Sequence, residues 1–446
     1  MSKTKNVREV ALDVLLAVEK HQSYSNILLN HVIKEHQLPP KDTALLTELT
    51  YGTIQRQYTL DYFLAPFLKK PKKLQSWVRQ LLRLSLYQMV FLDKIPDRAV
   101  IHEAVEIAKR KGHRGIAGLV NGVLRSVQRE GVPSLDQISD PIERISIETS
   151  HPIWLVKRWV EQFGLERTKQ MCEENLIAPV QTVRTNTVQL SREQLLDQLT
   201  NDGWNVQPSP IVPEGIRSLR GNLAHSQAFN EGLLTVQDES SMLVAHALKL
   251  TPGMKVLDCC AAPGGKTTHI AEMMDNEGEV WALDLHEHKV KLIEEQRNRL
   301  KLTIIHTKCI DSRKAGDYFA NETFDRVLVD APCSGLGVLR RKPDIKYSKN
   351  VEDVQALKSV QQSILHAVAP LVKQGGILVY STCTVDRDEN DRVIEQFLQQ
   401  HPEYMPEPLS LPEPVQPLVN GHQVQVFPQD FGSDGFYIAC LRKKVK

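Results

Sequence analysis

The chain has 446 residues, a formal net charge of +1 and a hydrophobic content of 41%. This length exceeds one ordinary domain, so we expect two or three. No apolar run approaches the roughly 20 residues of a membrane span, and the balanced charge does not indicate nucleic-acid binding through bulk electrostatics.

The first residues indicate the compartment, and the cysteines indicate whether disulfides or a metal site are expected. The first residues lead into an amphipathic pattern rather than the apolar core of a signal peptide, which predicts a cytoplasmic protein. The seven cysteines form no Cys-x-x-Cys pair, and their number is odd. This pattern disfavours a disulfide framework or a zinc site, so we expect no metal.

Residues 1–145 are predicted to form a helical bundle. Apolar residues recur at helical spacing over 7–18 and 45–49, and Asp42-Thr43 is the predicted N-cap of the second pattern. Further amphipathic patterns cover residues 77–91, 100–111 and 116–128. Six or seven helices with short connections are typical of a bundle.

Residues 150–235 are predicted to form a small α+β domain. Residues 182–186 and 204–206 have the pattern of strands, and residues 192–199 have that of a helix. Arg184 and Asn186 fit either nucleic-acid contacts or ordinary polar positions of a strand.

From residue 236 to 446 helical and strand patterns alternate. Such alternation predicts a doubly wound α/β domain with a mostly parallel sheet, whose ligands bind beyond the carboxyl ends of the strands. The predicted strands are 255–259, 279–285, 303–307, 324–330 and 376–382, and the helices are 268–274, 286–300 and 351–372.

A strand, a Pro-Gly-Gly turn and a helix start succeed one another over Val256–Ala271. Gly265, Lys266 and Thr267 fit a P-loop, but Cys260 stands where its first glycine belongs. The dinucleotide pattern Gly-x-Gly-x-x-Gly is also missing. The turn therefore indicates a ligand other than a nucleoside triphosphate or a dinucleotide.

Carboxylates follow several of the predicted strands. Asp284 lies about 20 residues past the glycines, where a carboxylate can hold ribose hydroxyls. It also fits a solvated strand end or a helix cap, and Asp311-Ser312 has the pattern of a cap too. Asp330 ends the fourth strand.

Two thiols, Cys333 and Cys383, directly follow strands that are predicted to end at the same edge. A thiol needs a helix N-terminus or a cation to ionise, and Lys266 is a candidate. Two thiols beside a carboxylate suit covalent catalysis on a weak electrophile such as a cytosine ring. The spacing does not decide which thiol is the nucleophile.

The first domain resembles the RNA-binding domain of the antitermination factor NusB. In that family the fold serves docking to RNA or protein. The residues that carry the resemblance are Arg8-x-x-Ala11-x-x-x-Leu15, Asp42-x-Ala44-Leu45-x-Thr47-Glu48-Leu49-x-Tyr51-Gly52, Tyr87-Gln88, Ile95-Pro96 and Val120-Asn121-x-Val123-Leu124-Arg125.

The last domain resembles S-adenosylmethionine-dependent RNA cytosine-C5 methyltransferases. Together with the NusB-like domain, it makes the chain similar to the RsmB (Sun, Fmu) subfamily, which methylates a cytosine of 16S rRNA. The matching motifs are Cys260-Ala-Ala-Pro-Gly-Gly-Lys-Thr267, Asp330-Ala-Pro-Cys-Ser-Gly335, Ser381-Thr-Cys-Thr384, Gln237-Asp-Glu-Ser-Ser241 and Asp434-Gly-Phe-Tyr437.

The resemblance implies a role for each motif residue. Cys383 is the nucleophile, Cys333 assists product release, Lys266 belongs to the catalytic set, and Asp330 lies against both the cofactor and the base. Asp284 holds the ribose and Asp311 the adenine of S-adenosyl-L-methionine. The remaining expected cofactor contacts are Cys260, Ala261, Ala262, Pro263, Gly264, Gly265 and Lys266.

The expected partner is 16S rRNA or a small-subunit assembly intermediate. We expect the protein to be a monomer and to have no membrane partner. The target base must leave its stack to reach the crevice, and Arg340, Arg341 and Lys342 are candidate phosphate contacts. Lys69–Lys73 and Arg125 could extend this track. The alternatives are the same chemistry on a tRNA or another rRNA cytosine, or a non-catalytic RNA-binding assembly or antitermination factor.

Overall fold

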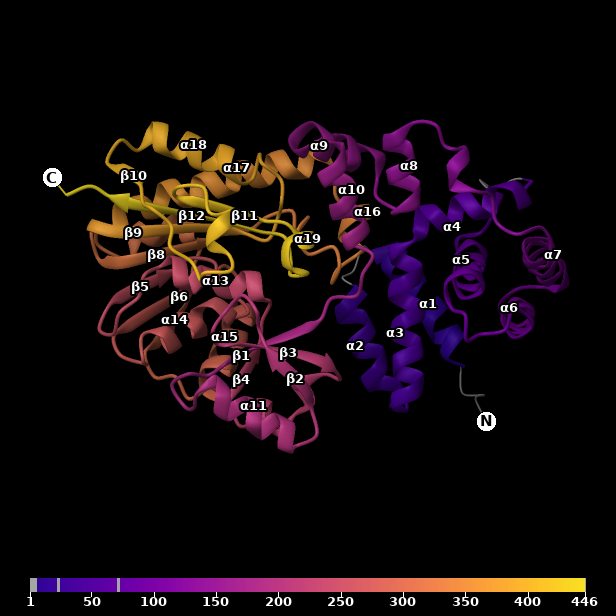
Figure 1. Ribbon diagram of the computed structural model, residues 1–446, viewed down its shortest axis with the longest axis horizontal. Coiled ribbons are helices and arrows are strands. Elements are labelled where there is room, and N and C mark those ends of the chain that lie inside the picture. Colours follow the sequence, from indigo (N-terminus) through magenta and orange to yellow (C-terminus); the bar gives the residue numbers. More distant parts are fainter. Residues whose placement is uncertain (1–5, 22–24, 70–72, 446) are drawn as a thin grey trace. The chain divides into compact units, whose positions relative to one another are not determined.

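The computed structural model describes residues 6–21, 25–69 and 73–445, and contacts divide the chain into two compact units (Figure 1). The helical unit contains the chain up to Ile177 together with Leu339–Lys349, and the α/β unit contains the rest. No helix of the described ranges is long and apolar enough to cross a membrane.

The predicted helical bundle is confirmed. Buried leucines such as Leu46, Leu49 and Leu81 form its core. The predicted cap at Asp42-Thr43 is wrong, because the third helix begins at Pro40, a residue that suits a first turn. The bundle helices are α1 (Val7–His21), α2 (Ser25–His36), α3 (Pro40–Gln55), α4 (Gln57–Leu64), α5 (Ser76–Phe91), α6 (Asp97–Lys111) and α7 (Arg114–Glu130).

The helical unit extends beyond the bundle, so its limits differ from the predicted boundaries at 145 and 150. It includes α8 (Pro141–Glu148), α9 (Ile153–Phe163) and α10 (Leu165–Glu174), as well as α16 (Ile345–Ser348) of the distant segment 339–349. The buried Lys346 donates to the Gln55 carbonyl at 2.9 Å, which anchors this segment in the helical unit.

The middle of the chain forms a four-stranded antiparallel sheet in the order β2-β3-β1-β4. The α+β prediction is confirmed here. The strands are β1 (Gln181–Thr185), β2 (Asn205–Pro208), β3 (Gly215–Arg220) and β4 (Leu234–Val236), and α11 (Arg192–Asn201) joins β1 to β2.

The second sheet has the order β10-β12-β9-β8-β5-β6-β7, with β11 paired to β12. Its parallel part confirms the doubly wound prediction, whereas the antiparallel strands β10, β11 and β12 were not expected. Its strands are β5 (Lys255–Asp258), β6 (Glu279–Asp284), β7 (Ile305–Cys309), β8 (Phe324–Asp330), β9 (Val372–Thr382), β10 (Tyr404–Pro406), β11 (Gln423–Val426) and β12 (Phe436–Lys443).

Helices cover both faces of this sheet (Figure 1). On one face, Leu243, Ile270 and Ile293 pack in one apolar cluster, and on the other Leu365 and Val393 pack in a second. Parallel sheets are covered on both faces in this way, and because β5 to β9 run parallel, their carboxyl ends lie at one edge. The helices are α13 (Glu239–Ala247), α14 (Gly265–Met273), α15 (Glu287–Arg299), α17 (Val351–Val368) and α18 (Asp391–Gln400).

A buried arginine joins the two sheets of the α/β unit. Arg184 of β1 forms an ion pair with Glu272 of α14 at 2.7 Å, and both side chains are at most 1% exposed. The guanidinium also donates to the Gly265 carbonyl at 2.8 Å and to Thr268 at 3.0 Å. Arg184 is therefore an internal link to the helix that follows the Pro-Gly-Gly turn, and it does not face nucleic acid.

We expect Arg184→Ala to lower the free energy of unfolding of the α/β unit by about 3–5 kcal/mol, because it leaves the Glu272 carboxylate buried without its partner. Urea denaturation measures this loss. The control is Arg192→Ala, which removes a pair with a mostly exposed Glu193 and should cost at most about 1 kcal/mol. Equal losses in the two variants would contradict the assignment.

Candidate active site

The Pro-Gly-Gly turn connects β5 to α14. Gly264 has a φ of +105°, and a Cβ there would lie 3.2 Å from the Ile293 Cα, so the turn requires glycine. Thr267 donates to Asp258 at 2.7 Å. Burial is the main reason why the pKa of Asp258 rises to about 7. The turn thus presents backbone, rather than a charged side chain of the first strand, to the space beyond the sheet.

Lys266 and Asp330 form an ion pair between this turn and the end of β8. The Lys266 Nζ lies 2.8 Å from one Asp330 oxygen, and Ser381 donates to the other at 2.8 Å. The same Nζ lies 5.1 Å from the centre of the Phe436 ring. Burial alone would lower the pKa of Lys266, but the Asp330 charge outweighs it and the net pKa is raised. Lys266 is therefore a fixed cation.

The two candidate thiols lie side by side. The Sγ atoms of Cys333 and Cys383 are 3.4 Å apart. The contact with Cys383, together with burial, raises the pKa of Cys333 well above its usual value, so this thiol holds its proton. Cys259 is packed in the core, as expected for a small apolar side chain, and burial raises the pKa of Cys260.

One cavity of about 440 Å³ joins the residues that follow β5, β6, β7, β8 and β9. Asp284, Asp311, Asp330, Cys333 and Cys383 are among the residues that line it. Asp311 also caps the next 3-10 helix and pairs with Arg313 at 2.6 Å, which lowers its pKa. Cys260 and Ala262 of the turn line the same cavity, so backbone of the turn, carboxylates and thiols face one space.

The closing Asp434-Gly-Phe-Tyr437 motif packs against both cysteine loops. Gly337 donates its N–H to the Cys383 carbonyl at 3.0 Å, and Gly435 donates to the Gly337 carbonyl at 2.8 Å. The Asp434 N–H donates to Asp238, the cap of α13, at 3.1 Å. Sequence reasoning assigned these glycines no role, since their importance comes from backbone contacts between distant segments.

The predicted phosphate contacts lie in the helical unit. Arg340 is 4% exposed, pairs with Glu174 at 3.3 Å and donates to the Ile177 carbonyl at 3.1 Å. The expectation that Arg340 contacts RNA does not fit this burial. Arg341 and Lys342 are half-buried and stay predictions. Of the Lys69–Lys73 run, residues 70–72 lie outside the described ranges.

A histidine and glutamate cluster joins the middle sheet to α13 and α14. Glu214 lies 3.0 Å from His246 and 3.0 Å from His269. These three side chains are close enough to hold a cation. His246 shares a hydrogen bond with Glu214, whereas the ring nitrogens of the buried His269 have no hydrogen-bond partner among the described residues. The absence of a metal stays a prediction.

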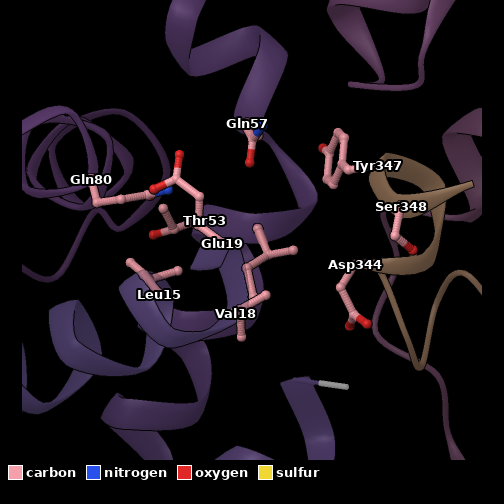
Figure 2. A pocket seen from close by; sticks show the side chains of 10 residues that line it. Leu15, Val18, Glu19, Thr53, Gln57, Gln80, Asp344, Tyr347 and Ser348 are labelled. Carbon is pink, nitrogen blue, oxygen red and sulfur yellow. The ribbon is translucent and has the colours of Figure 1, made fainter. Parts of the chain in front are cut away.

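A separate cavity of about 200 Å³ lies inside the helical unit. Figure 2 shows Glu19 and Thr53 of the bundle on one side, and Asp344 and Tyr347 of the 339–349 segment on the other. Its lining contains neither a thiol nor a lysine. It therefore lacks the groups that mark the cavity of the α/β unit as the candidate active site.

The doubly wound sheet thus brings the glycine turn, the carboxylates and the two thiols to the edge where ligands of such sheets bind, and this domain is of the methyltransferase class. The chain belongs to the RsmB/F family of 16S rRNA methyltransferases, whose family model matches residues 245–442. The NusB family model matches residues 5–129, and an RsmF/B-like ferredoxin-like domain matches residues 151–222. The chain is thus an S-adenosylmethionine-dependent enzyme that methylates cytosine of 16S rRNA.

Relatives match this chain over its full length. It is 55% identical to a probable ribosomal RNA small subunit methyltransferase B of Bacillus subtilis, with 100% of both chains covered. It is 34% identical to the ribosomal RNA small subunit methyltransferase B of Proteus mirabilis, again over 100% of both. The crystal structure of PH0851 is similar at 27% identity and a TM-score of 0.83, covering 98% of each chain.

We expect Gly337→Ala to destabilise the cysteine loops, because the new Cβ would lie 2.0 Å from the Gly435 carbonyl oxygen. Overpacking of this kind costs about 1–3 kcal/mol. Thermal unfolding and methyl transfer measure the effect. A Cβ at Gly316 meets nothing within 4 Å, so Gly316→Ala should match the wild type. An unchanged Gly337→Ala enzyme would show that this contact does not matter.

Proposed function

We propose that this enzyme methylates carbon 5 of the cytosine through a covalent bond between Cys383 and carbon 6. The observation that supports the proposal best is the 3.4 Å separation of two thiols at the end of the cavity where Lys266 pairs with Asp330. A thiol can add to a polarised pyrimidine, and the pair can polarise it.

The cofactor would be held by the residues of the glycine turn and by the carboxylates beyond β6 and β7. Asp284 would accept hydrogen bonds from the ribose hydroxyls, and Asp311 would lie near the adenine. When bound, S-adenosylmethionine supplies an electrophilic methyl group attached to a positively charged sulfur. Gly264 keeps the turn free of a side chain, so backbone can approach that ligand.

Cys383 and the Lys266–Asp330 pair act directly on the cytosine ring in the proposed reaction. The Cys383 thiolate forms the S–C6 bond. The Lys266 ammonium, held by Asp330, donates a hydrogen bond to N3 and so stabilises the negative charge that moves onto the ring. The electron pair at carbon 5 then bonds to the methyl carbon, whose bond to the sulfonium sulfur breaks. Solvent water in the open cavity then accepts the proton from carbon 5. The electron pair of that C–H bond re-forms the C5–C6 double bond, the S–C6 bond breaks, and the Cys383 thiolate leaves.

Cys333 would assist this last step. Its raised pKa keeps the thiol protonated, so it can donate a hydrogen bond to the departing Cys383 sulfur 3.4 Å away. A thiolate departs more readily when a hydrogen-bond donor stabilises the negative charge on its sulfur. The family resemblance, rather than the geometry of the two thiols, assigns release to Cys333 and attack to Cys383.

The substrate would be 16S rRNA or a small-subunit assembly intermediate, met in the cytoplasm by a monomeric enzyme. The NusB-like helices supply an RNA-docking surface in this proposal, with Arg341 and Lys342 as phosphate contacts. The target cytosine must be flipped out of its stack, since the thiols lie in a cavity.

We expect Cys383→Ala to lower methyl transfer by roughly 10³-fold or more, because the covalent route is lost. We expect Cys333→Ala to accumulate a covalent protein–RNA adduct. Labelled methyl transfer to 16S rRNA from a strain lacking the enzyme gives the rates, and a denaturing gel shows the adduct. An adduct that requires Cys333 and survives loss of Cys383 would reverse the roles, and label outside 5-methylcytosine would refute the reaction.

We expect Asp284→Ala to raise the Kd for S-adenosylmethionine by about 10-fold, which corresponds to about one lost hydrogen bond to a charged acceptor. Isothermal titration calorimetry on the free enzyme measures this change. The control Asp317→Ala removes an exposed carboxylate outside the cavity and should leave the Kd unchanged. An unaltered Kd in Asp284→Ala would remove Asp284 from the cofactor site.

A further inference from the structure

Two buried polar residues follow the second cysteine loop. Glu389 and Asn390 lie between the Thr-Cys motif and α18, and their side chains are 0% and 1% exposed. Burying a carboxylate and an amide costs free energy unless their hydrogen bonds are made. The partners of these two side chains therefore indicate what they do.

Glu389 holds the loop that carries Cys333. One carboxylate oxygen accepts the Ser334 N–H at 2.8 Å, and the other accepts the Ser334 hydroxyl at 2.5 Å. Gln361 of α17 donates to Glu389 at 3.0 Å and to the Pro332 carbonyl at 2.9 Å. The residues on both sides of Cys333 are thus fixed by one carboxylate and its amide neighbour.

Asn390 holds the strand end that carries Cys383. Its side-chain oxygen accepts the Thr382 hydroxyl at 2.6 Å, and its amide nitrogen donates to the Thr384 carbonyl at 3.1 Å. Gln425 of β11 accepts a second hydrogen bond from the same nitrogen at 2.8 Å. The residues on both sides of Cys383 are therefore fixed by one amide.

The two loops are also joined directly. Ser334 and Thr384 share a hydrogen bond of 3.0 Å between their hydroxyls. Tyr380 of β9 donates to the backbone carbonyl of Glu389 at 2.6 Å. Because Glu389 and Asn390 are consecutive, a single peptide links the support of one thiol to the support of the other.

We propose that Glu389 and Asn390 are paired positioning residues, Glu389 for the release thiol Cys333 and Asn390 for the nucleophile Cys383. This inference rests on the proposed roles of the two thiols. Both side chains act through the residues that flank each cysteine. A misplacement of about 1 Å can cost a reacting group 10²-fold, so each residue governs one half of the reaction.

Substituting Glu389 should therefore slow breakdown of the adduct, and substituting Asn390 should slow its formation. Glu389→Ala should resemble loss of Cys333: the adduct forms at a rate near that of the wild type but breaks down at least about 10-fold more slowly. Asn390→Ala should resemble loss of Cys383: the adduct forms at least about 10-fold more slowly and does not accumulate. A purely structural role would slow both steps together.

The experiment is a single-turnover time course with 16S rRNA and S-adenosylmethionine, in which a denaturing gel gives adduct and labelled methyl gives product. The full-length variants are Glu389→Ala, Asn390→Ala and the conservative Glu389→Gln, which keeps an acceptor for Ser334 and should restore most of the release rate. Glu395→Ala, an exposed position of α18, is the matched control. Cofactor titration and thermal unfolding establish that each variant is folded.

Several outcomes decide the proposal. Opposite effects in the two alanine variants, with rescue by Glu389→Gln, support it. Equal slowing of formation and release in folded variants, or no effect in either, overturns it. If Glu389→Ala does not fold, a Glu389→Gln enzyme that releases as slowly as Cys333→Ala would also overturn it. A wild-type enzyme that methylates cytosine without any Cys383 adduct would instead refute the proposed function.

Discussion

The ion pair between Lys266 and Asp330 connects the two halves of the active site. Lys266 comes from the start of α14, directly after the glycine turn, and Asp330 precedes the loop with Cys333. Removing two charges from water is costly, and a buried pair often adds little to stability. Its value lies in geometry, because Asp330, Ser381 and Phe436 fix the position of the Lys266 cation, which the proposed reaction uses to stabilise charge on the ring.

Throughout the α/β unit, apolar contacts supply stability and buried polar groups supply orientation. Apolar side chains on both faces of the large sheet supply the burial that keeps it folded. Buried polar groups then stand where separate segments meet: Arg184 with Glu272 between the sheets, and Glu389 with Ser334 beside the thiols. Hydrogen bonds are directional and apolar contacts are not, so these polar groups orient loops that packing alone would leave free to shift.

Much of this arrangement could be predicted from the sequence because it depends on local pattern. The strand 324–330 was placed correctly, and parallel strands bring their ends to one edge, so Asp330, Cys333 and Cys383 were expected together. The antiparallel strand β12 could not be found this way, since its place depends on pairing with β9 and β11. The supporting roles of Gly337 and Glu389 likewise depend on partners about 50 or more residues away.

The segment 339–349 shows why a charged run is a weak indication of a binding surface. Arg340 belongs to a basic triplet, yet its guanidinium is buried against Glu174, and the neighbouring Lys346 is buried with a carbonyl partner. Burial lowers the pKa of Lys346 to about 7, a cost that packing within the helical unit must offset. This segment begins two residues after Gly337. The backbone of Gly337 forms hydrogen bonds with Cys383 and Gly435 within the α/β unit. The contacts that position the thiols therefore also fix the end of the α/β segment that precedes residue 339.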